Sequence, residues 1–539
     1  MGSLTATRLD NAPSVKQKVF QRMFEHLGMG DHSAVSNLIV TKVGNNLKYW
    51  AEEQEIVGKT LELLLDMASG YSSSKLLLTL DTVKFLARNH TEDHFPFLAL
   101  PANVRHRTTF HATLTRLLLS PSGEEKLGLT FDQFMEPICR VMSQLEALSP
   151  TELRSEAARR PMIGVFRDLR GITVAMHNRK TFSMLFDTLH PLHLPFLARV
   201  ADIWWDQPDV IISLLKFLLE FCHNKANRIN FDQSSANGIL LFRTVSDVVC
   251  AFGRRTLAAP VPVTNGGGED IYKRRLKGIS LALNVLNSAL GGNYVCFGVF
   301  KLYKDPCLDS ALEVALQLTL TIPLDHVMSY PKVSKAYFAF LEILFRNHIS
   351  TALALETSVF MQLMSAVHEG LQASDATLSS ACANSVDHLA TFYFEFQTNI
   401  KVDKPGVMNL KKVCVLRRII HLQILIILTL FYFQHLAAHP SLFPSLTSTV
   451  FNLLLFGPPA NHWAVLRPIL SLVLADESSF TAYKDHLVAT QTPENQQQLN
   501  EAFSKLLQDT SRNLESSNRE RFTQKLTAFR VAARSFLTV

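Results

Sequence analysis

Apolar residues recur at helical spacing in one segment of this chain after another, whereas period-two alternation over a whole segment is hard to find. The stretch from Pro208 to Leu219 is typical, because four of its apolar residues fall on one stripe: Ile211, Leu214, Leu215 and Leu218. Glycine is also scarce, at 22 of 539 residues against a usual share of ~7%, which disfavours hairpins and other tight turns. These features predict an all-α chain.

Local signals mark where several helices begin. Pro208 suits the first turn of its helix, where its missing backbone donor costs nothing. At Asp305-Pro306, a capping carboxylate precedes proline and an apolar series that begins at Leu308. A third helix is predicted from Ser334 to Asn347. Turn residues stand between such helices: Gly70-Tyr71-Ser72, Asn178, Gly266-Gly267-Gly268 and Pro458-Pro459.

Taken in pairs, the predicted helices repeat at about 40–50 residues, which is the period of HEAT-type repeats. Each pair in such a stack packs only against its neighbours, so we expect no globular domain boundary. The sequence therefore predicts an all-α, HEAT/ARM-like helical-repeat superhelical solenoid. The loops around residues 259–270 and 397–409 are predicted to be flexible insertions.

Two short patterns resemble active-site motifs but lack a required residue. Gly58-Lys59-Thr60 looks like the end of a phosphate-binding loop, yet the glycine needed five positions before Gly58 is Glu53. His368-Glu369 would begin a zinc-protease helix, yet Gln372 stands where the second histidine belongs. Neither pattern therefore predicts an active site.

The other histidines and the cysteines are predicted to be structural. His190 and His193 have no carboxylate or cysteine at metal-ligand spacing. The seven cysteines lie far apart with no C-x-x-C pair, which argues against a zinc or redox site and favours a reducing compartment. We therefore predict no catalytic residue, no cofactor and no metal site.

One apolar run challenges the prediction of a soluble protein. The fifteen residues from Ile419 to Phe433 are mostly apolar, but a bilayer span needs ~20 residues, and His421 and Gln423 interrupt the run. A buried helix is therefore favoured over a membrane span, with a membrane-attached protein as an alternative. The N-terminal residues lack the apolar core of a signal peptide.

The net charge is +6, and basic residues cluster briefly at Lys273, Arg274, Arg275 and Lys277. This cluster is short and is not interleaved with exposed aromatic platforms, so nucleic-acid binding is disfavoured. A solvated helix face is favoured for this cluster. The alternative is a contact with an acidic protein partner, which is the functional role we assign to these four residues.

Several less periodic segments resemble consecutive stretches of the exportins, which belong to the importin-β superfamily. The segments that carry the resemblance include Asn46–Trp50, Phe231–Arg243, Lys277–Ser280, Gly292–Tyr303 and Asn518–Leu526. Seven residues within them are expected to be structural, most of them as turn and cap residues: Asn237, Gly238, Arg243, Asn293, Tyr294, Gly298 and Tyr303.

The resemblance also implies how the chain is divided. It covers residues 20–400 and 434–535 and implies a divergent segment at 1–19, helical repeats at 20–400, a divergent insertion at 401–433 and C-terminal helical repeats at 434–539. It resembles only the C-terminal half of an exportin. The main Ran-binding region of the family therefore has no counterpart in this sequence.

The resemblance implies a nuclear transport receptor of the exportin type, not an enzyme, that carries protein cargo from the nucleus to the cytoplasm through the nuclear pore complex. The implied partners are the Ran GTPase, whose binding is expected to be weak or lost, protein cargo and nuclear pore proteins. In this family, Ran in its GTP form and cargo bind together, and hydrolysis of GTP removes the coupling. The alternative is a helical-repeat scaffold with no transport activity.

Overall fold

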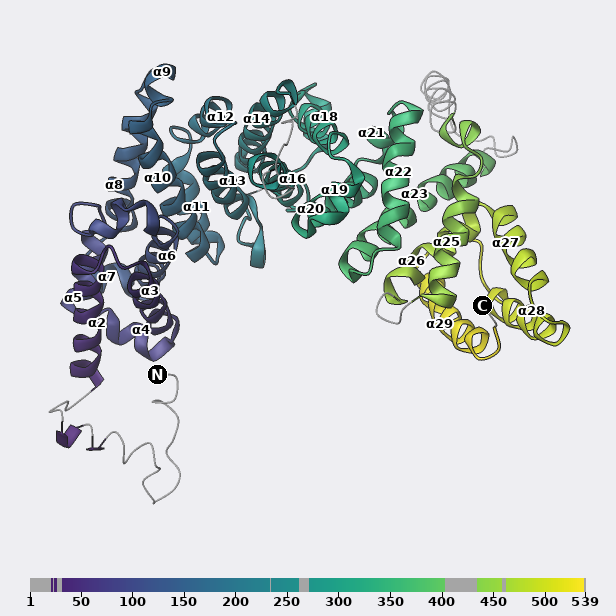
Figure 1. The fold of residues 1–539 in the computed structure, drawn as a ribbon, viewed down its shortest axis with the longest axis horizontal. Helices are drawn as coiled ribbons and strands as arrows, with labels where there is room; N and C mark the ends of the chain where they lie inside the picture. The colour runs from purple at the N-terminus through teal and green to yellow at the C-terminus, as the bar shows by residue number, and fades with distance from the viewer. Residues whose placement is uncertain are drawn as a thin grey trace. The chain divides into compact units, whose positions relative to one another are not determined.

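A computed structural model describes residues 21–22, 24–26, 32–232, 234–260, 271–402, 434–457 and 462–537 (Figure 1). Every element in these ranges is a helix, and none of them is a strand. The prediction of an all-α helical-repeat fold is therefore confirmed. The segment 1–19, the run Ile419–Phe433 and the turn residues Gly266–Gly268 and Pro458-Pro459 lie outside the described residues.

The chain divides into two compact units, Met1–Thr321 and Ile322–Val539. Neither the period of the helices nor the predicted boundaries near residues 400 and 433 mark this division. In a stack of helix pairs each pair packs only on its neighbours, so the sequence of a boundary pair looks like any other.

The first unit contains a continuous layer of helices, each packed against the next: α3 (Gln54–Ser69), α6 (His106–Leu118), α10 (Glu156–Ala175), α13 (Pro208–Cys222) and α16 (Lys277–Leu290). A second helix packs on each of them in the same order: α2 (His32–Tyr49), α5 (Asp81–Arg88), α8 (Phe131–Glu146), α12 (Leu194–Ile203) and α14 (Asn237–Ala258). Helix α18 (Cys307–Leu320) packs on α14. This pairing is that of a helical-repeat protein.

Short helical segments connect the long helices of the first unit. They are α4 (Tyr71–Leu77), η1 (Pro96–Ala99), η2 (Pro101–Asn103), α7 (Gly123–Leu127), α9 (Pro150–Leu153), α11 (Arg179–Leu189), η3 (Lys225–Asn227), η4 (Tyr272–Leu276) and α17 (Gly298–Leu302).

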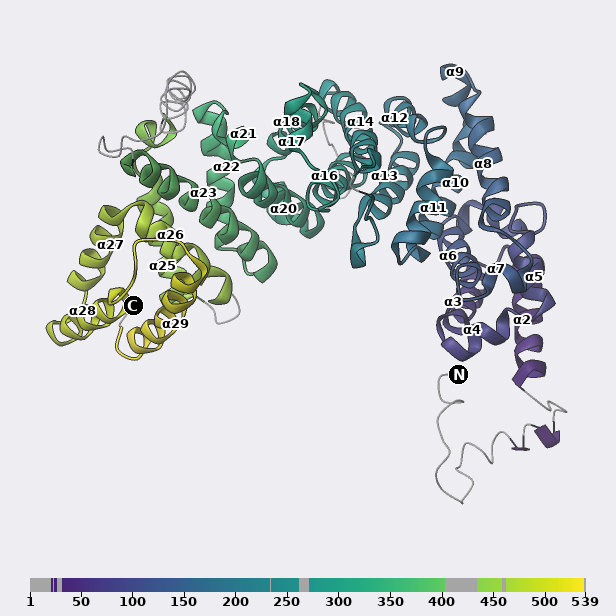
Figure 2. The ribbon, with the colours of Figure 1, turned by 180° about the vertical axis from the view of Figure 1, so that it is seen from behind.

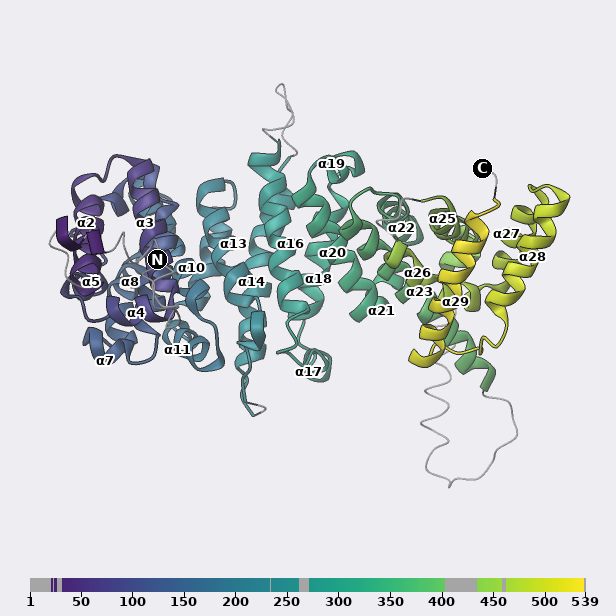
Figure 3. The ribbon, with the colours of Figure 1, turned by 90° about the horizontal axis from the view of Figure 1, so that it is seen from below.

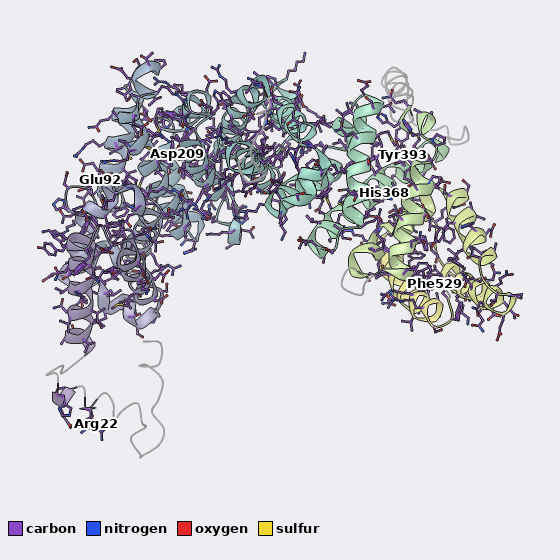
Figure 4. The ribbon with its side chains drawn as sticks, viewed as in Figure 1. Arg22, Glu92, Asp209, His368, Tyr393 and Phe529 are labelled. Carbon is purple, nitrogen blue, oxygen red and sulfur yellow. The ribbon has the colours of Figure 1, made fainter. Side chains whose placement is uncertain are left out.

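The second unit is built in the same way around α23 (Ala376–Val402), which packs against α20 (Pro331–Asn347), α22 (Thr357–Leu371) and α26 (His462–Ala475). The remaining helices of this unit are α19 (Leu324–Ser329), α21 (Ile349–Leu353), α25 (Leu442–Phe456), α27 (Glu477–Ala489), α28 (Pro493–Leu507) and α29 (Ser516–Arg534). Tyr393 of α23 and Phe529 of α29, labelled in Figure 4, are both core residues.

Helix α13 shows why these residues form the core. The four residues of its predicted stripe are buried, and so are Val210, Phe217 and Phe221, which widen the buried face on one side of that stripe. These extra residues are buried because α13 lies between α10, α12 and α16. Full burial of one such side chain contributes about 1.5–3 kcal/mol, so tertiary packing rather than helix propensity stabilises α13.

The predicted helix starts are largely confirmed. Pro208 occupies the first turn of α13, and the Asp305 carboxylate accepts a hydrogen bond from the Cys307 backbone at 3.0 Å at the start of α18. Asn178, predicted only as a turn residue between helices, also caps α11 by accepting a hydrogen bond from the Thr181 backbone at 3.0 Å.

Three local predictions are wrong. Helix α20 begins at Pro331, not at Ser334, because proline is accommodated in a first helical turn. Tyr71 and Ser72 begin α4, so only Gly70 separates two helices. Residues 397–402 end α23 and are not a loop, and the rest of that predicted insertion lies outside the described residues.

Among the described residues, none of the helices combines the length and the apolar character that crossing a membrane would require. The apolar run that raised the question, Ile419–Phe433, is not among those residues.

Candidate protein-binding surface

The predicted basic cluster lies where a π-helical turn runs into a long helix. Lys273, Arg274 and Arg275 belong to η4, and Lys277 is the first residue of α16. Leu276 between them is buried and anchors the turn. The side chains of Lys273 and Arg274 are exposed, whereas those of Arg275 and Lys277 are half-buried.

Burial lowers the pKa of the Arg275 guanidinium. The structure also brings Lys277 within electrostatic range of Lys216 on α13. The predicted cluster therefore continues onto a neighbouring helix that lies 61 positions earlier in the sequence at Lys216.

Lys216 is the centre of this larger basic group. Its side chain is half-buried, and burial, followed by the positive charges of Arg167, Arg170, Lys277 and Arg105, lowers its pKa to about 8. The Arg167 guanidinium has a lowered pKa for the same reasons. Burial and then the charges of Arg170 and Arg105 lower this pKa to about 10. Like charges thus gather here against their mutual repulsion.

These five residues come from consecutive helices of one layer. Arg105 directly precedes α6, Arg167 and Arg170 lie on α10, Lys216 lies on α13 and Lys277 begins α16. Figure 2 shows these four helices from behind, and Figure 3 shows α10, α13 and α16 from below. We call Arg105, Arg167, Arg170, Lys216 and Lys277 the basic row.

The helices that carry the row approach each other closely. The Thr108 hydroxyl of α6 donates a hydrogen bond to the Arg167 carbonyl of α10 at 3.1 Å. A Cβ atom at Gly171 would lie 2.4 Å from the Thr108 carbonyl oxygen, so only glycine allows this approach. The start of α6 is thereby fixed against the middle of α10.

Several arginines elsewhere in the first unit have acidic partners. Arg154 pairs with Asp206 at 2.8 Å, Arg255 pairs with Asp202 at 2.6 Å, and Arg159 pairs with Asp209, which Figure 4 labels, at 2.7 Å. In the part of the chain that the structure describes, no such ion pair involves the residues Arg105, Arg167, Arg170 or Lys216. The Nε atoms of Arg167 and Arg170 are buried and lack a hydrogen-bond partner there.

The residues that carry the family resemblance lie near the start of α14. A Cβ atom at Gly238 would lie 2.2 Å from the Tyr294 carbonyl oxygen, and the Tyr294 hydroxyl donates to the Cys222 carbonyl at 3.1 Å. Asn293, next to Tyr294, has a left-handed backbone with φ of 56°. The loop after α16 therefore packs against both α13 and α14.

The other members of this set have varied surroundings. Arg243 pairs with Asp305 at 2.6 Å, and the Asn237 backbone donates to the Ser235 hydroxyl at 3.1 Å. No atom lies within 4 Å of a Cβ built at Gly298. Tyr303 follows α17 and is 76% exposed.

The rejected motifs have ordinary packing roles. Gly58 lies inside α3, where its Cβ would contact the His106 ring at 3.0 Å, and His368 Nε2 lies 2.7 Å from the Thr449 hydroxyl. His193 Nδ1 lies 2.7 Å from Glu146 Oε1, a partner 47 residues away that sequence spacing did not reveal. Within the described ranges, no group of three His, Cys, Asp or Glu residues could hold a metal ion.

Comparison with known proteins gives consistent relationships. A family profile described as "Exportin-7-like, TPR domain" matches residues 6–106. The chain is 36% identical to Exportin-7-B of Xenopus laevis over 520 residues. The aligned stretch covers 95% of this chain and 46% of that protein. The chain is 35% identical over 518 residues to Ran-binding protein 17 of Homo sapiens, with the same two shares.

A third relative extends this relationship to insects. The chain is 34% identical to Ran-binding protein 16 of Drosophila melanogaster over 529 residues. The aligned stretch covers 96% of this chain and 46% of that protein. The chain thus spans less than half the length of the relatives it matches. Along nearly its entire length, the chain is homologous to exportin-7 and to Ran-binding proteins 16 and 17.

Proposed function

We propose that this chain acts as a nuclear transport receptor of the exportin type and takes part in the Ran-dependent export of protein cargo. The observation that carries the proposal is homology over 95% of the chain to proteins whose names state export or Ran binding. A stack of helix pairs suits this task, because it offers a long surface to folded partners.

The mechanism is linkage, not catalysis. In a complete receptor of this type, Ran in its GTP form and a cargo protein bind the solenoid together, each favouring the same curvature, so each raises the affinity for the other. Hydrolysis of GTP on Ran removes that coupling and releases the cargo in the cytoplasm. The chain itself binds, and we assign it no chemical step.

The chain matches 46% of the length of Exportin-7-B and of Ran-binding protein 17. We propose that this stretch corresponds to the C-terminal half of these relatives and does not itself contain their main Ran-binding region. It then binds cargo and nuclear pore proteins, moves between nucleus and cytoplasm, and binds Ran weakly or not at all. A pull-down with Ran loaded with GTP or GDP tests this point: GTP-selective binding at micromolar affinity or better contradicts it.

The second candidate is a helical-repeat scaffold without transport activity, which the same architecture supports. Passage through nuclear pores separates the two candidates. A transport receptor enters the nuclei of permeabilised cells faster than an inert protein of equal size, whereas a scaffold enters at the inert rate.

A further inference from the structure

We propose that the basic row is the binding site for an extended acidic segment of a protein partner, which lies across α6, α10, α13 and α16. The proposal rests on the proposed function only for the identity of that partner as cargo. The charge of the row itself carries the choice of an acidic occupant.

The local sequence of α10 places two positive charges on one face of the helix. Arg167 and Arg170 stand three positions apart and therefore share one helix face. Asp168 between them points the other way and is buried against Arg107 of α6. The one acidic residue of this stretch is thus occupied, and the two arginines, both half-buried, carry like charge on another face of the helix.

Two arginines of the basic row have an unsatisfied hydrogen-bond donor among the described residues. Both Arg167 and Arg170 keep a buried Nε without a partner among the described residues. Buried donors without partners destabilise the folded state, and charge repulsion adds to that cost. A carboxylate placed between them would accept hydrogen bonds from both guanidinium groups and reduce the repulsion.

The packing of successive helices sets the spacing of the cations in the basic row. Packed helices lie about 8–10 Å apart, and an extended peptide advances about 3.3 Å per residue. An acidic residue at about every third position of an extended segment would therefore meet one cation on each successive helix. The row thus specifies both the charge and the pattern of its partner.

The surroundings of the basic row favour a protein partner over a nucleic acid. Single-stranded nucleic acids are held by basic groups together with exposed aromatic rings on which bases stack. Among the described residues, the exposed large hydrophobic side chains lie elsewhere, and none belongs to α6, α10, α13 or α16. The row therefore offers charge without a stacking platform.

A titration accompanies such binding. Lys216, with a pKa of about 8, faces Arg167 and Arg170 of α10, Lys277 of α16 and Arg105 at the start of α6. An anion bound among these groups raises the pKa of Lys216, so the complex takes up protons near pH 8.

The test measures binding of a fluorescent twelve-residue peptide of Glu-Gly-Ser repeats to the full chain. The double variant Arg167→Glu/Arg170→Glu should weaken binding by at least about tenfold. The matched control Arg140→Glu/Lys180→Glu makes the same change in net charge on α8 and α11 and should weaken it less than about twofold. Equal losses in both variants, or no loss in the first, would overturn the proposal.

Further arms guard against misfolding and against other ligands. The milder double variant Arg167→Gln/Arg170→Gln, with an unchanged thermal melt, should also weaken binding. A twelve-residue oligothymidylate should bind less tightly than the peptide, and tighter binding would overturn the choice of a protein partner. Calorimetry at pH 8 in two buffers should show proton uptake that Lys216→Arg abolishes, and uptake that persists in this variant contradicts the placement of the peptide.

The nuclear-entry assay separates the two proposals. If the chain enters nuclei rapidly but peptide binding does not depend on Arg167 and Arg170, the basic row alone is contradicted. If the peptide binds as described but the chain enters nuclei at the inert rate, the transport function alone is contradicted.

Discussion

Arg107 of α6 and Asp168 of α10 form a buried bidentate ion pair. The Arg107 Nε and Nη2 atoms donate to the two Asp168 carboxylate oxygens at 2.8 and 2.5 Å. Both side chains are at most 10% exposed, and His111 Nδ1 lies 3.1 Å from the same carboxylate. Although burial raises it, the charges of Arg107 and His111 hold the pKa of Asp168 below its usual range. This pair joins the two helices that carry the start of the basic row.

Asp168→Asn is expected to destabilise the first unit strongly. The change leaves the Arg107 guanidinium buried without its main counter-ion, a loss of about 3–5 kcal/mol. Arg107 also pairs with Glu92, labelled in Figure 4, at 2.8 Å, but that carboxylate is more exposed. Thermal unfolding followed by circular dichroism measures the loss. The exposed pair of Arg140 and Glu136 provides the control, because Arg140→Gln should cost less than about 1 kcal/mol.

His90 is expected to make the folded state sensitive to mild acid. Burial, and next the charge of His111, lower its pKa to about 3, and its ring packs at a tilt of 36° against the Phe134 ring, with the centroids 4.2 Å apart. Between about pH 6.5 and pH 3 the unfolded chain binds a proton that the folded chain does not, so stability falls as the pH falls.

Urea unfolding at a series of pH values tests this expectation. The variant His90→Phe should lose less stability than the wild type between pH 6.5 and pH 4, because the titrating group is gone. His94→Gln, an exposed change nearby, should keep the wild-type dependence. An unchanged slope in His90→Phe would show that His90 is not the titrating group.

Arg228 is expected to hold together the C-terminal ends of α10 and α13. Its side chain is fully buried, and its Nη1 atom donates to the carbonyls of Thr173 and Met176, each at 2.8 Å. Its Nε and Nη2 atoms donate to the carbonyls of His223 and Glu220. Lysine cannot reproduce this fork of donors, and each carbonyl left unsatisfied costs about 1–3 kcal/mol.

Hydrogen exchange checks this role of Arg228. In Arg228→Lys, amides in the last turns of α10 and α13 should exchange faster than in the wild type, and the thermal midpoint should fall. Arg179→Lys, at an exposed ion pair with Asp232, should leave both unchanged. Equal protection of those turns in Arg228→Lys would contradict the bridging role.

Two glycines of the family resemblance are expected to respond differently to alanine. At Gly238 the added Cβ would lie 2.2 Å from the Tyr294 carbonyl oxygen, so Gly238→Ala must shift backbone and should cost about 1–3 kcal/mol. At Gly298 nothing lies within 4 Å, so Gly298→Ala should change stability by less than about 0.5 kcal/mol. Denaturant midpoints of the two variants provide the measurement, and similar values for both would contradict the described packing.

The helical class could be predicted because its signals are local. The apolar stripe of α13, the Asn178 cap and the Asp305 hydrogen bond at the start of α18 are each encoded within a few residues. The basic cluster at Lys273–Lys277 could be found in the same way, because its charges are neighbours in the sequence.

The remainder of the row could not be predicted, because each helix contributes one or two charges and loops of varied length separate them. Lys216 and Arg167 become neighbours only when α10 and α13 pack. The second unit shows the same limit: Asp387 accepts a hydrogen bond from Arg519 at 2.9 Å across 132 residues. No local pattern encodes such a contact.

The transport function is tested most directly by the rate at which the fluorescent chain enters the nuclei of permeabilised cells. An inert protein of equal size is measured alongside it, and excess unlabelled chain serves as competitor. The account predicts entry that is faster than that of the inert protein and that slows when the competitor is added. Entry at the inert rate, unaffected by the competitor, would contradict it.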